Sequence, residues 1–303
     1  VIFLVFLGLA AGLRYGLVQQ DKRQIEANLT NEARAMANHL EREFLIHAEA
    51  IRRMAKRLEA DPAKTKQEWR RDARNYLDDF GVYQAIEWID SDFIIRWLEP
   101  ITDNEEVIGY NVAFNEERRQ ALERAKQSGS WDLSGIINLR QGGKGMVIYA
   151  PVGAGPENNG FIAGVFRMEV LARQLLTERV LESFRVEIRE AGEVSYELNV
   201  SQPVSRDFAQ TQDVNLPTLD WTLTLRPSTE WVESQYSYWP GMTFATLLLM
   251  GLLTSLTTLL VQLILKRNRA LLKTRRELDQ EIAQRTAIQK DLARLESTDT
   301  LTG

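Results

Sequence analysis

Residues 85–98 read Ala-Ile-Glu-Trp-Ile-Asp-Ser-Asp-Phe-Ile-Ile-Arg-Trp-Leu. Two runs of β-branched and aromatic residues flank the polar triplet Asp90-Ser91-Asp92. Such side chains favour strands, and a short polar segment between two such runs favours a turn. The stretch therefore predicts a β-hairpin, and it marks the point where the periodicity of the chain changes from helical to extended.

The segment before the hairpin carries a long helical pattern. Between Gln19 and Asp61, residues in one row recur in steps of three and four: Ile25, Leu29, Ala33, Met36, Leu40, Phe44, His47, Ile51, Met54 and Leu58. This spacing puts one apolar stripe on an α-helix. Pro62 ends the helix because proline disfavours helical backbone at the residue before it. We predict one stalk helix over 19–61, with two shorter helices as the alternative, and a second amphipathic helix over 66–79.

The segments after the hairpin alternate between helix and strand. A helix is predicted over 115–127 with Gly129 as its stop, and three strands follow at Trp131–Leu139, Gly145–Val152 and Gly160–Met168. Glycine-rich turns at Gln141–Gly145 and Asn158–Gly160 separate them. A second strand group predicts a smaller sheet, at Phe184–Glu190, Val194–Asn199 and Trp221–Arg226. A hairpin, a helix and three antiparallel strands are the order of a PAS-like sensor sheet, so we predict an α+β fold with two subdomains.

Two apolar segments frame this region. The segment from Thr243 to Leu265 carries no formal charge, and a membrane span needs about 20 apolar residues. An aromatic belt precedes it, and basic residues follow it at Lys266, Arg267, Arg269, Lys273, Arg275 and Arg276. The positive-inside rule then places the C-terminal side in the cytoplasm. At the other end, Val1–Leu13 is apolar, and we expect it to belong to a membrane helix, with a signal-peptide core as the alternative.

Composition excludes several classes of function. The net charge of -5 and a pI of about 5.4 argue against a nucleic-acid partner, which would meet a basic face. Because the chain has no cysteine, disulfides, thiolate zinc sites and cysteine nucleophiles are excluded. The two histidines, His39 and His47, lack the spacing of a zinc helix, and we expect them at the surface or at a dimer seam. We therefore expect no catalytic residue, metal site or cofactor in this chain.

Several short motifs between residues 80 and 170 resemble a known sensor family. They are Ile86-Glu87-Trp88-Ile89-Asp90, Asn104-Glu105, Gly109-Tyr110-Asn111, Glu117-Arg118-Arg119 with Ala121, and Gln141-Gly142-Gly143-Lys144-Gly145 leading to Tyr149-Ala150-Pro151-Val152. Their order and spacing resemble the CHASE domain, the extracytoplasmic sensor of bacterial sensor proteins and plant cytokinin receptors. The resemblance implies two stacked PAS-like subdomains on a long stalk helix, with a small-molecule ligand in the membrane-distal one.

The resemblance also suggests where that ligand binds. Asn111 matches an acidic residue that holds the purine ring in the family's cytokinin receptors, Leu133 falls at a pocket-wall position, and Tyr149 replaces a small threonine. Because these differences remove a charge and fill volume, an adenine-type ligand does not carry over. Trp88, Trp97 and Trp131 are further pocket candidates, with core packing or a place on the sheet surface as the alternative. Arg96 and Arg119 could neutralise an anionic ligand, although ion-paired arginine is the commoner role.

The segment after the second apolar stretch is charged and helical. Its apolar residues form an imperfect heptad seam at Leu271, Leu278, Ile282, Ile288, Leu292 and Leu295, which predicts a signalling coiled coil and a homodimer. The last residues, Asp299-Thr300-Leu301-Thr302-Gly303, resemble the opening of the GGDEF domain. That resemblance implies a diguanylate cyclase output, with or without a following phosphodiesterase (EAL) domain.

Together these patterns predict a multi-pass protein of the bacterial inner membrane, in contact with lipid, with a sensor outside the cytoplasm. The predicted parts are a first membrane helix at 1–18, a stalk at 19–61, a distal subdomain at 62–175, a proximal subdomain at 176–238, a second membrane helix at 239–265, a coiled coil at 266–297 and the start of an output domain at 298–303. The alternative functions are the sensor region of a histidine kinase and a non-enzymatic chemoreceptor-like sensor.

Overall fold

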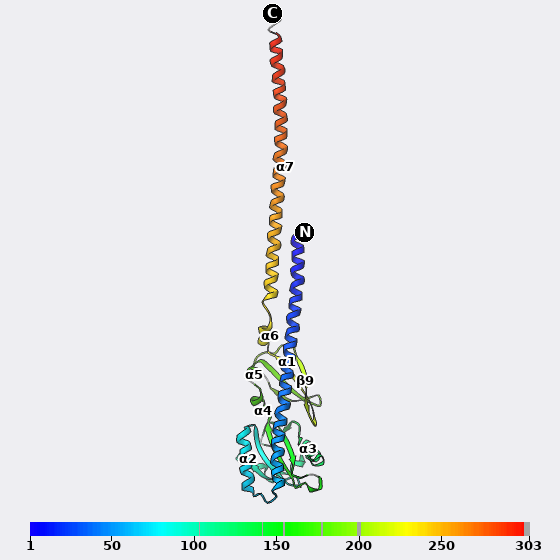
Figure 1. Cartoon of the computed structure of the whole chain (residues 1–303), viewed down its shortest axis with the longest axis vertical. Helices are drawn as coiled ribbons and strands as arrows, with labels where there is room; N and C mark the ends of the chain where they lie inside the picture. The colour runs from blue at the N-terminus through cyan, green and yellow to red at the C-terminus, as the bar shows by residue number, and fades with distance from the viewer. Residues whose placement is uncertain (103, 141, 154, 177, 199–200, 300–303) are drawn as a thin grey trace. The chain divides into compact units, whose positions relative to one another are not determined.

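The computed structural model describes residues 1–102, 104–140, 142–153, 155–176, 178–198 and 201–299. The chain forms two units, Lys22–Tyr236 and a helical unit of Val1–Asp21 with Ser237–Gly303 (Figure 1). The larger unit holds two antiparallel sheets and several helices, so the expected mixture of helices and antiparallel sheets is confirmed. Gln141, Asn199 and Thr300–Gly303, which belong to motifs and strands predicted above, lie outside the described residues.

Helix α1 (Ile2–Ala60) is one continuous helix that ends before Pro62, as predicted for the stalk, rather than two shorter ones. Every residue of the predicted stripe is buried, including His47, which contradicts the surface position expected for it. The stripe packs against both sheets of the larger unit. Phe44 meets Trp221 edge-on at 5.7 Å between ring centres, and the Tyr83 hydroxyl donates to the His47 carbonyl at 3.3 Å.

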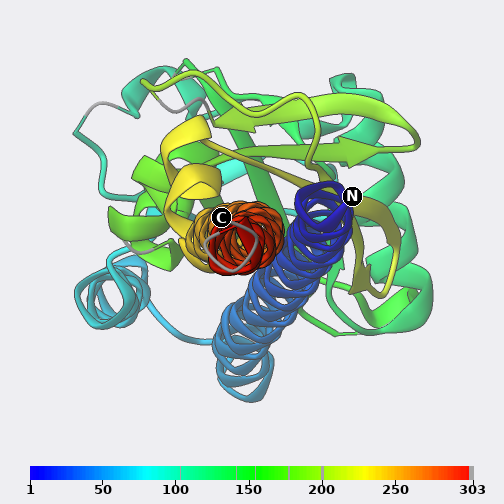
Figure 2. The ribbon, with the colours of Figure 1, turned by 90° about the horizontal axis from the view of Figure 1, so that it is seen from above.

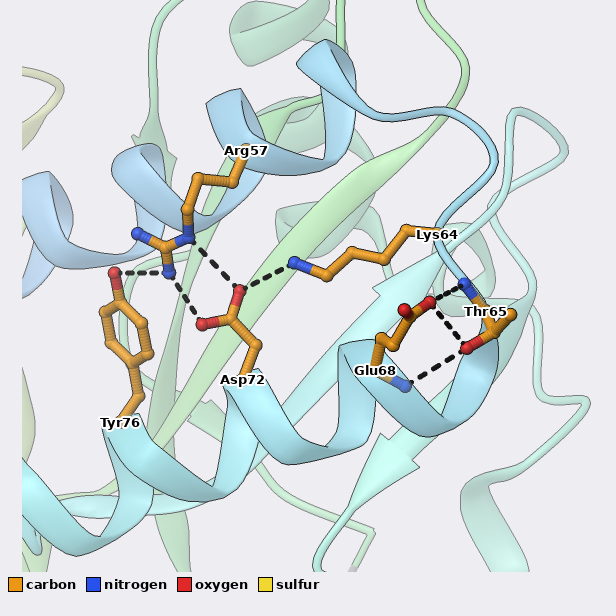
Figure 3. Close-up of polar contacts among 6 residues, drawn as sticks. All are labelled: Arg57, Lys64, Thr65, Glu68, Asp72 and Tyr76. Atoms are coloured by element: carbon orange, nitrogen blue, oxygen red, sulfur yellow. Dashed lines mark hydrogen bonds and ion pairs between the residues drawn. The ribbon is translucent and has the colours of Figure 1, made fainter.

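Helix α2 (Lys66–Phe80) follows α1 and begins at a capping box. The Thr65 hydroxyl accepts from the Glu68 amide, while the Glu68 carboxylate accepts from the Thr65 amide at 2.9 Å. The Asp72 carboxylate then accepts from Arg57 at 2.9 Å and from Lys64 at 3.1 Å. These contacts hold the start of α2 against the end of α1 (Figure 3).

Sheet 1 has the strand order β2-β1-β6-β5-β3, with β4 also paired to β5. Its strands are β1 (Tyr83–Ile89), β2 (Ile95–Glu99), β3 (Asp132–Leu133), β4 (Ile137–Asn138), β5 (Lys144–Pro151) and β6 (Phe161–Arg167). β1 and β2 form the predicted hairpin, and the Asp90 carboxylate caps its turn by accepting from the amides of Asp92 and Ile94. The strand predicted over 131–139 was wrong in extent, because Gly135 at φ +75° breaks it into β3 and β4.

Helix α3 (Glu116–Ser128) covers the face of sheet 1 opposite to α1. Asn115 caps its start, and Gly129 ends it in the left-handed region at φ +64°, as predicted. Two short 3-10 turns, η1 (Glu105–Val107) and η2 (Val112–Phe114), lead from β2 into α3, and η3 (Gly155–Glu157) lies between β5 and β6. Sheet 1 is therefore buried on both faces, which explains the continuous apolar runs of β5 and β6.

Sheet 2 has the strand order β8-β7-β10-β9. Its strands are β7 (Phe184–Glu190), β8 (Glu193–Leu198), β9 (Gln210–Leu216) and β10 (Leu219–Pro227). In the chain, helices α4 (Met168–Leu175) and α5 (Glu178–Ser183) precede β7, and α6 (Thr229–Gln235) follows β10. β7, β8 and β10 were predicted. β9 was missed because Gln-Thr-Gln-Asp-Val-Asn-Leu is rich in polar residues, and Thr211, Asp213 and Asn215 point to solvent.

The helical unit pairs the first turns of α1 with α7 (Trp239–Asp299), and Figure 2 shows them side by side. A Cβ on Gly251 would lie 2.6 Å from the Cβ of Phe6, so the two helices approach closely there. The Arg14 guanidinium also lies 5.2 Å from the centre of the Phe244 ring. Among the described residues, α1 and α7 are each long and apolar enough to cross a membrane. The seam residues Leu271, Leu278, Ile282, Ile288 and Leu292 are exposed.

Candidate functional site

The face of sheet 1 that meets α1 and α2 is closed by aromatic packing. Trp88 and Trp97 are cross-strand partners in the hairpin, with ring centres 4.4 Å apart. Trp69 from α2 packs on Trp97 at 5.7 Å and is itself 1% exposed. Leu133 is fully buried in the same apolar cluster. These side chains hold the helices to the sheet.

The face that meets α3 is different because it contains charge. Alternation along β1 puts Glu87 on this face together with Ala85 and Ile89. The strand register pairs Glu87 with Ala163, and Ala163 with Tyr149. A small residue therefore separates two large polar ones in a row across three strands, which leaves a hollow in the surface of the sheet.

A cavity of about 120 Å³ lies over this hollow. The residues that line it come from β1, the loops around η1 and η2, α3, and β4 with the turn after it: Glu87, Val107, Tyr110, Asn115, Arg118, Asn138 and Arg140. Six of these seven residues are polar or charged, so the cavity is suited to a polar ligand.

The first turn of α3 places Arg118 in the cavity wall. Asn115 caps the helix, and its side-chain oxygen accepts from the Arg118 amide at 2.9 Å. Arg118 precedes Ala121, Leu122 and Ala125 by three, four and seven residues, so it shares their buried face. Only 7% of the Arg118 surface is exposed. Its charge therefore faces the sheet rather than solvent.

The charged groups of the cavity are strongly affected by burial. Burial raises the pKa of Glu87 to about 7, although the Arg118 charge acts to lower it. For Arg118, burial disfavours the cation, but the nearby Tyr149 and Glu87 outweigh it and the pKa lies above its usual range. Burial also raises the pKa of Tyr149, which keeps its hydroxyl protonated. Shifts of this kind are typical of functional sites.

The rim of the cavity is formed by a cation stacked on an aromatic ring. The Arg140 guanidinium lies 4.5 Å from the centre of the Tyr110 ring. Tyr110 is fixed by its backbone, since the Ile95 amide donates to its carbonyl at 3.0 Å. Arg140 is exposed, so its side chain can reorient as a ligand enters.

The five predicted site residues do not gather in one place. Trp88, Trp97 and Leu133 lie on the α1 face of sheet 1, whereas Tyr149 lies on the α3 face beneath the cavity. Asn111 joins two loops: its amide donates to the Asp92 carbonyl at 3.0 Å, and its side-chain oxygen accepts from the Ala113 amide at 2.9 Å. Whether any of the five contacts a ligand stays a prediction.

The two arginines proposed for an anionic ligand are ion-paired at the surface. Arg96 pairs with Asp90 at 2.5 Å, and Arg119 pairs with Glu116 and Glu123. The sequence analysis did not single out Glu87 and Arg118 as site residues, although both side chains face the interior and line the cavity. A signal for them existed, because Glu87 alternates with apolar residues on one side of a strand and Arg118 falls on the apolar side of its helix.

Two other features of the described residues are weaker candidates. No group of three or more His, Asp or Glu side chains in the described part of the chain could hold a metal ion. A larger, open groove of about 580 Å³ is lined by residues that include Lys144, Glu169, Arg173 and Tyr196. Glu169 and Arg173 are more than two-thirds exposed and pair with each other, so solvent already satisfies much of the charge in this groove.

A family model of the CHASE domain matches residues 33–198. No curated protein sequence matches the chain. The solved structures that resemble it include an extracellular ligand-binding receptor from Desulfohalobium retbaense, at 16% identity and a TM-score of 0.53. That match covers 64% of this chain and 39% of the receptor, so the chain spans well under half of its length.

Two chemoreceptor ligand-binding domains are also similar. The domain of Pseudomonas fluorescens CtaA in complex with L-isoleucine shows 12% identity and a TM-score of 0.55, over 72% of this chain and 98% of that one. The domain of Pseudomonas aeruginosa PctC in complex with GABA shows 14% identity and a TM-score of 0.50, over 67% and 99%. At these identities the similarity establishes the fold alone.

Proposed function

Because this chain belongs to the CHASE domain family, we propose that it is the sensor region of a membrane receptor for a small molecule. Residues 22–236 form the sensing unit outside the cytoplasm. The ligand binds in the cavity between α3 and sheet 1, and the helical unit carries the signal across the membrane.

The observation that carries this proposal is the pair of buried ionisable side chains in the cavity, Glu87 and Arg118. Burying a charge costs several kcal/mol unless partners compensate it. Glu87 is 1% exposed, and its Oε2 atom has no hydrogen-bond partner among the described residues. A ligand that satisfies these groups would explain why they are kept in an otherwise apolar face. Similarity in fold to domains solved with L-isoleucine and GABA gives further support.

A binding measurement tests the sensor. The full chain in lipid nanodiscs is heated with a panel of small acids, amines and amino acids. We expect at least one compound to stabilise it, because a ligand at a hundred times its Kd adds about 2.7 kcal/mol to stability. Arg118→Gln should abolish the shift, whereas Arg119→Gln should not, since Arg119 is the next residue and is paired at the surface. Equal loss in both variants would contradict the proposed site.

The orientation proposed for the membrane rests on the basic residues after Leu265 and on the two apolar helices. The receptor is then a multi-pass protein of the bacterial inner membrane, surrounded by lipid, with its C-terminal side in the cytoplasm. Because the chain has no cysteine, single-cysteine variants report topology directly. A membrane-impermeant maleimide should label Glu193→Cys in intact cells, and Arg285→Cys only after permeabilisation. The reverse pattern would invert the topology.

The proposed output is a diguanylate cyclase, and the seam on α7 forms a homodimer that brings two copies together. Support comes from the Asp299–Gly303 motif and from the exposed apolar seam. The test is the reading frame beyond Gly303, where a Gly-Gly-Asp/Glu-Glu-Phe loop should lie within about 150 residues, a usual domain length. A phosphoacceptor histidine helix would instead indicate a histidine kinase, and a long uninterrupted coiled coil a chemoreceptor, the function of the CtaA and PctC relatives.

A further inference from the structure

The cavity between α3 and sheet 1 holds opposite charges on different walls. The acid, Glu87, lies on the floor in β1, and the base, Arg118, enters from α3. Arg118 acts on Glu87 through space, but the Glu87 Oε2 atom receives no hydrogen bond in the described part of the chain. Glu87 and Arg118 line one cavity and do not bond each other among the described residues, so a ligand in the cavity can contact both side chains.

Such a ligand must satisfy both charges at once. A donor with positive charge fits Glu87, because an ionised carboxylate only accepts hydrogen bonds. A planar anion such as a carboxylate fits Arg118, because a guanidinium can bind it in a bidentate manner. Arg140 at the rim adds a second cation to the lining of the cavity. The walls thus complement a molecule with one ammonium and one carboxylate.

The volume limits the size of that molecule. The cavity has a volume of about 120 Å³. Sites for drug-sized ligands are larger, at about 300–1,000 Å³. A compact molecule with few heavy atoms fits.

We propose that the cavity binds a small free amino acid, with its ammonium group at Glu87 and its carboxylate at Arg118 and Arg140. This assignment rests on the proposed sensor function and names its ligand class. Because different residues bind the two ends of the ligand, substitutions in the protein can test each end separately. Glu87 selects for the amine, and the two arginines select for the acid.

The test uses L-alanine and two analogues on the full chain in nanodiscs, measured by calorimetry. Propionate lacks the amine, and L-alaninamide lacks the carboxylate. We expect L-alanine to bind at least about tenfold more tightly than either, because each analogue leaves one buried charged group of the cavity without its partner. L-tryptophan should bind more weakly than L-alanine because it exceeds the cavity. Equal binding of propionate and L-alanine would overturn the inference.

Substitutions locate each end of the ligand. Glu87→Gln should weaken L-alanine about tenfold or more and leave propionate unchanged, whereas Arg118→Gln should weaken both. Arg140→Gln, at the exposed rim, is the second variant if a buried change prevents folding, and it should weaken both acids. Arg119→Gln is the matched control and should change neither.

The outcomes separate this inference from the sensor proposal. If another compound binds in an Arg118-dependent manner and no amino acid binds, the ligand class is wrong and the sensing site stands. If compounds bind but no cavity variant changes their affinity, both are wrong. If L-alanine binds and Glu87→Gln has no effect, the placement of the ammonium is wrong.

Discussion

The two sheets bury acidic residues in opposite ways. In sheet 2, Glu187 on β7 lies between Arg189 at 3.2 Å and Arg226 at 3.5 Å, so its charge is satisfied within the sheet. In sheet 1, Glu87 on β1 lies beneath α3, and its Oε2 atom has no hydrogen-bond partner among the described residues. Helix α3 makes the difference, because it closes the second face of sheet 1 and encloses a cavity there.

Under the proposed function, sheet 1 encloses the ligand and sheet 2 does not contact it. The second face of sheet 2 carries polar side chains that pair across strands, such as Thr211 with Thr224 at 2.9 Å. Its apolar face packs on α1 through Trp221. The buried carboxylate of sheet 2 therefore needs no ligand to satisfy its charge. Three comparisons between matched residues and one measurement on a surface ion pair test this view.

The largest difference should come from two turn glycines. A Cβ on Gly160, in the turn that enters β6, would lie 2.1 Å from the Ile89 carbonyl oxygen, whereas one on Gly192, between β7 and β8, would meet nothing within 4 Å. Both have positive φ, so alanine is strained at each. We expect Gly160→Ala to cost about 3 kcal/mol or more and Gly192→Ala about 1 kcal/mol. Urea unfolding measures both, and equal costs would mean that the turns of sheet 1 are not tightly packed.

The second comparison is the pH dependence of the two buried acids. The pKa of Glu87 is raised by burial to about 7, so the folded chain holds a proton that the unfolded chain releases above about pH 4.5. Stability therefore falls as the pH rises from about 4.5 to 7, by about 3 kcal/mol in total. Unfolding from pH 4.5 to 8 should show this fall, and Glu87→Gln should remove it. In the Glu187→Gln control the fall should persist. If the stability of the wild-type chain does not fall over this pH range, Glu87 is ionised and paired in the folded state.

The third comparison uses the two histidines of α1. Burial lowers the pKa of His47, against the opposing charge of Glu43 at 3.9 Å, and Phe80, Tyr83 and Phe166 surround the ring. A lowered pKa gives stability that is present above pH 6.5 and lost as the pH falls below it. His47→Gln should flatten this loss. His39→Gln should not, because the His39 side chain is 40% exposed. Equal behaviour of the two variants would place His47 in contact with solvent.

The smallest effect should come from the surface pair of α4. Glu169 and Arg173 are 68% and 71% exposed and lie one turn apart. Such pairs contribute about 0.3–0.5 kcal/mol, and salt screens them. Arg173→Gln should therefore change the unfolding free energy by less than about 0.5 kcal/mol, and 1 M salt should remove the difference. A larger change in unfolding free energy would show that the Glu169–Arg173 pair, beside the open groove, contributes to stability.

Local signals predicted most of the elements. The stripe of α1 and the ends of α2 and α3 follow from periodicity and capping, which neighbouring residues determine. The break at Gly135 and the polar strand β9 were missed, because pairing with β5 and β10 rather than composition defines those strands.

The site was harder to predict than the fold. The position of Arg118 on the inner side of its helix was readable from spacing, and so was the side of Glu87 on its strand. That α3 covers that side of sheet 1 is a tertiary fact, and so is the register that sets Glu87 and Tyr149 on either side of Ala163. Trp88 and Trp97 were predicted as pocket residues; the structure shows them packed on each other on the α1 face of sheet 1, and their contact with a ligand stays a prediction.

Hydrogen–deuterium exchange on the full chain, with and without the compound that stabilises it most, tests most directly which face of sheet 1 binds the ligand. We predict slower exchange in the 105–115 loops and in α3 around Arg118, with no change in α2. Protection of α2 around Trp69, with α3 unchanged, would place the ligand on the opposite face and contradict the account.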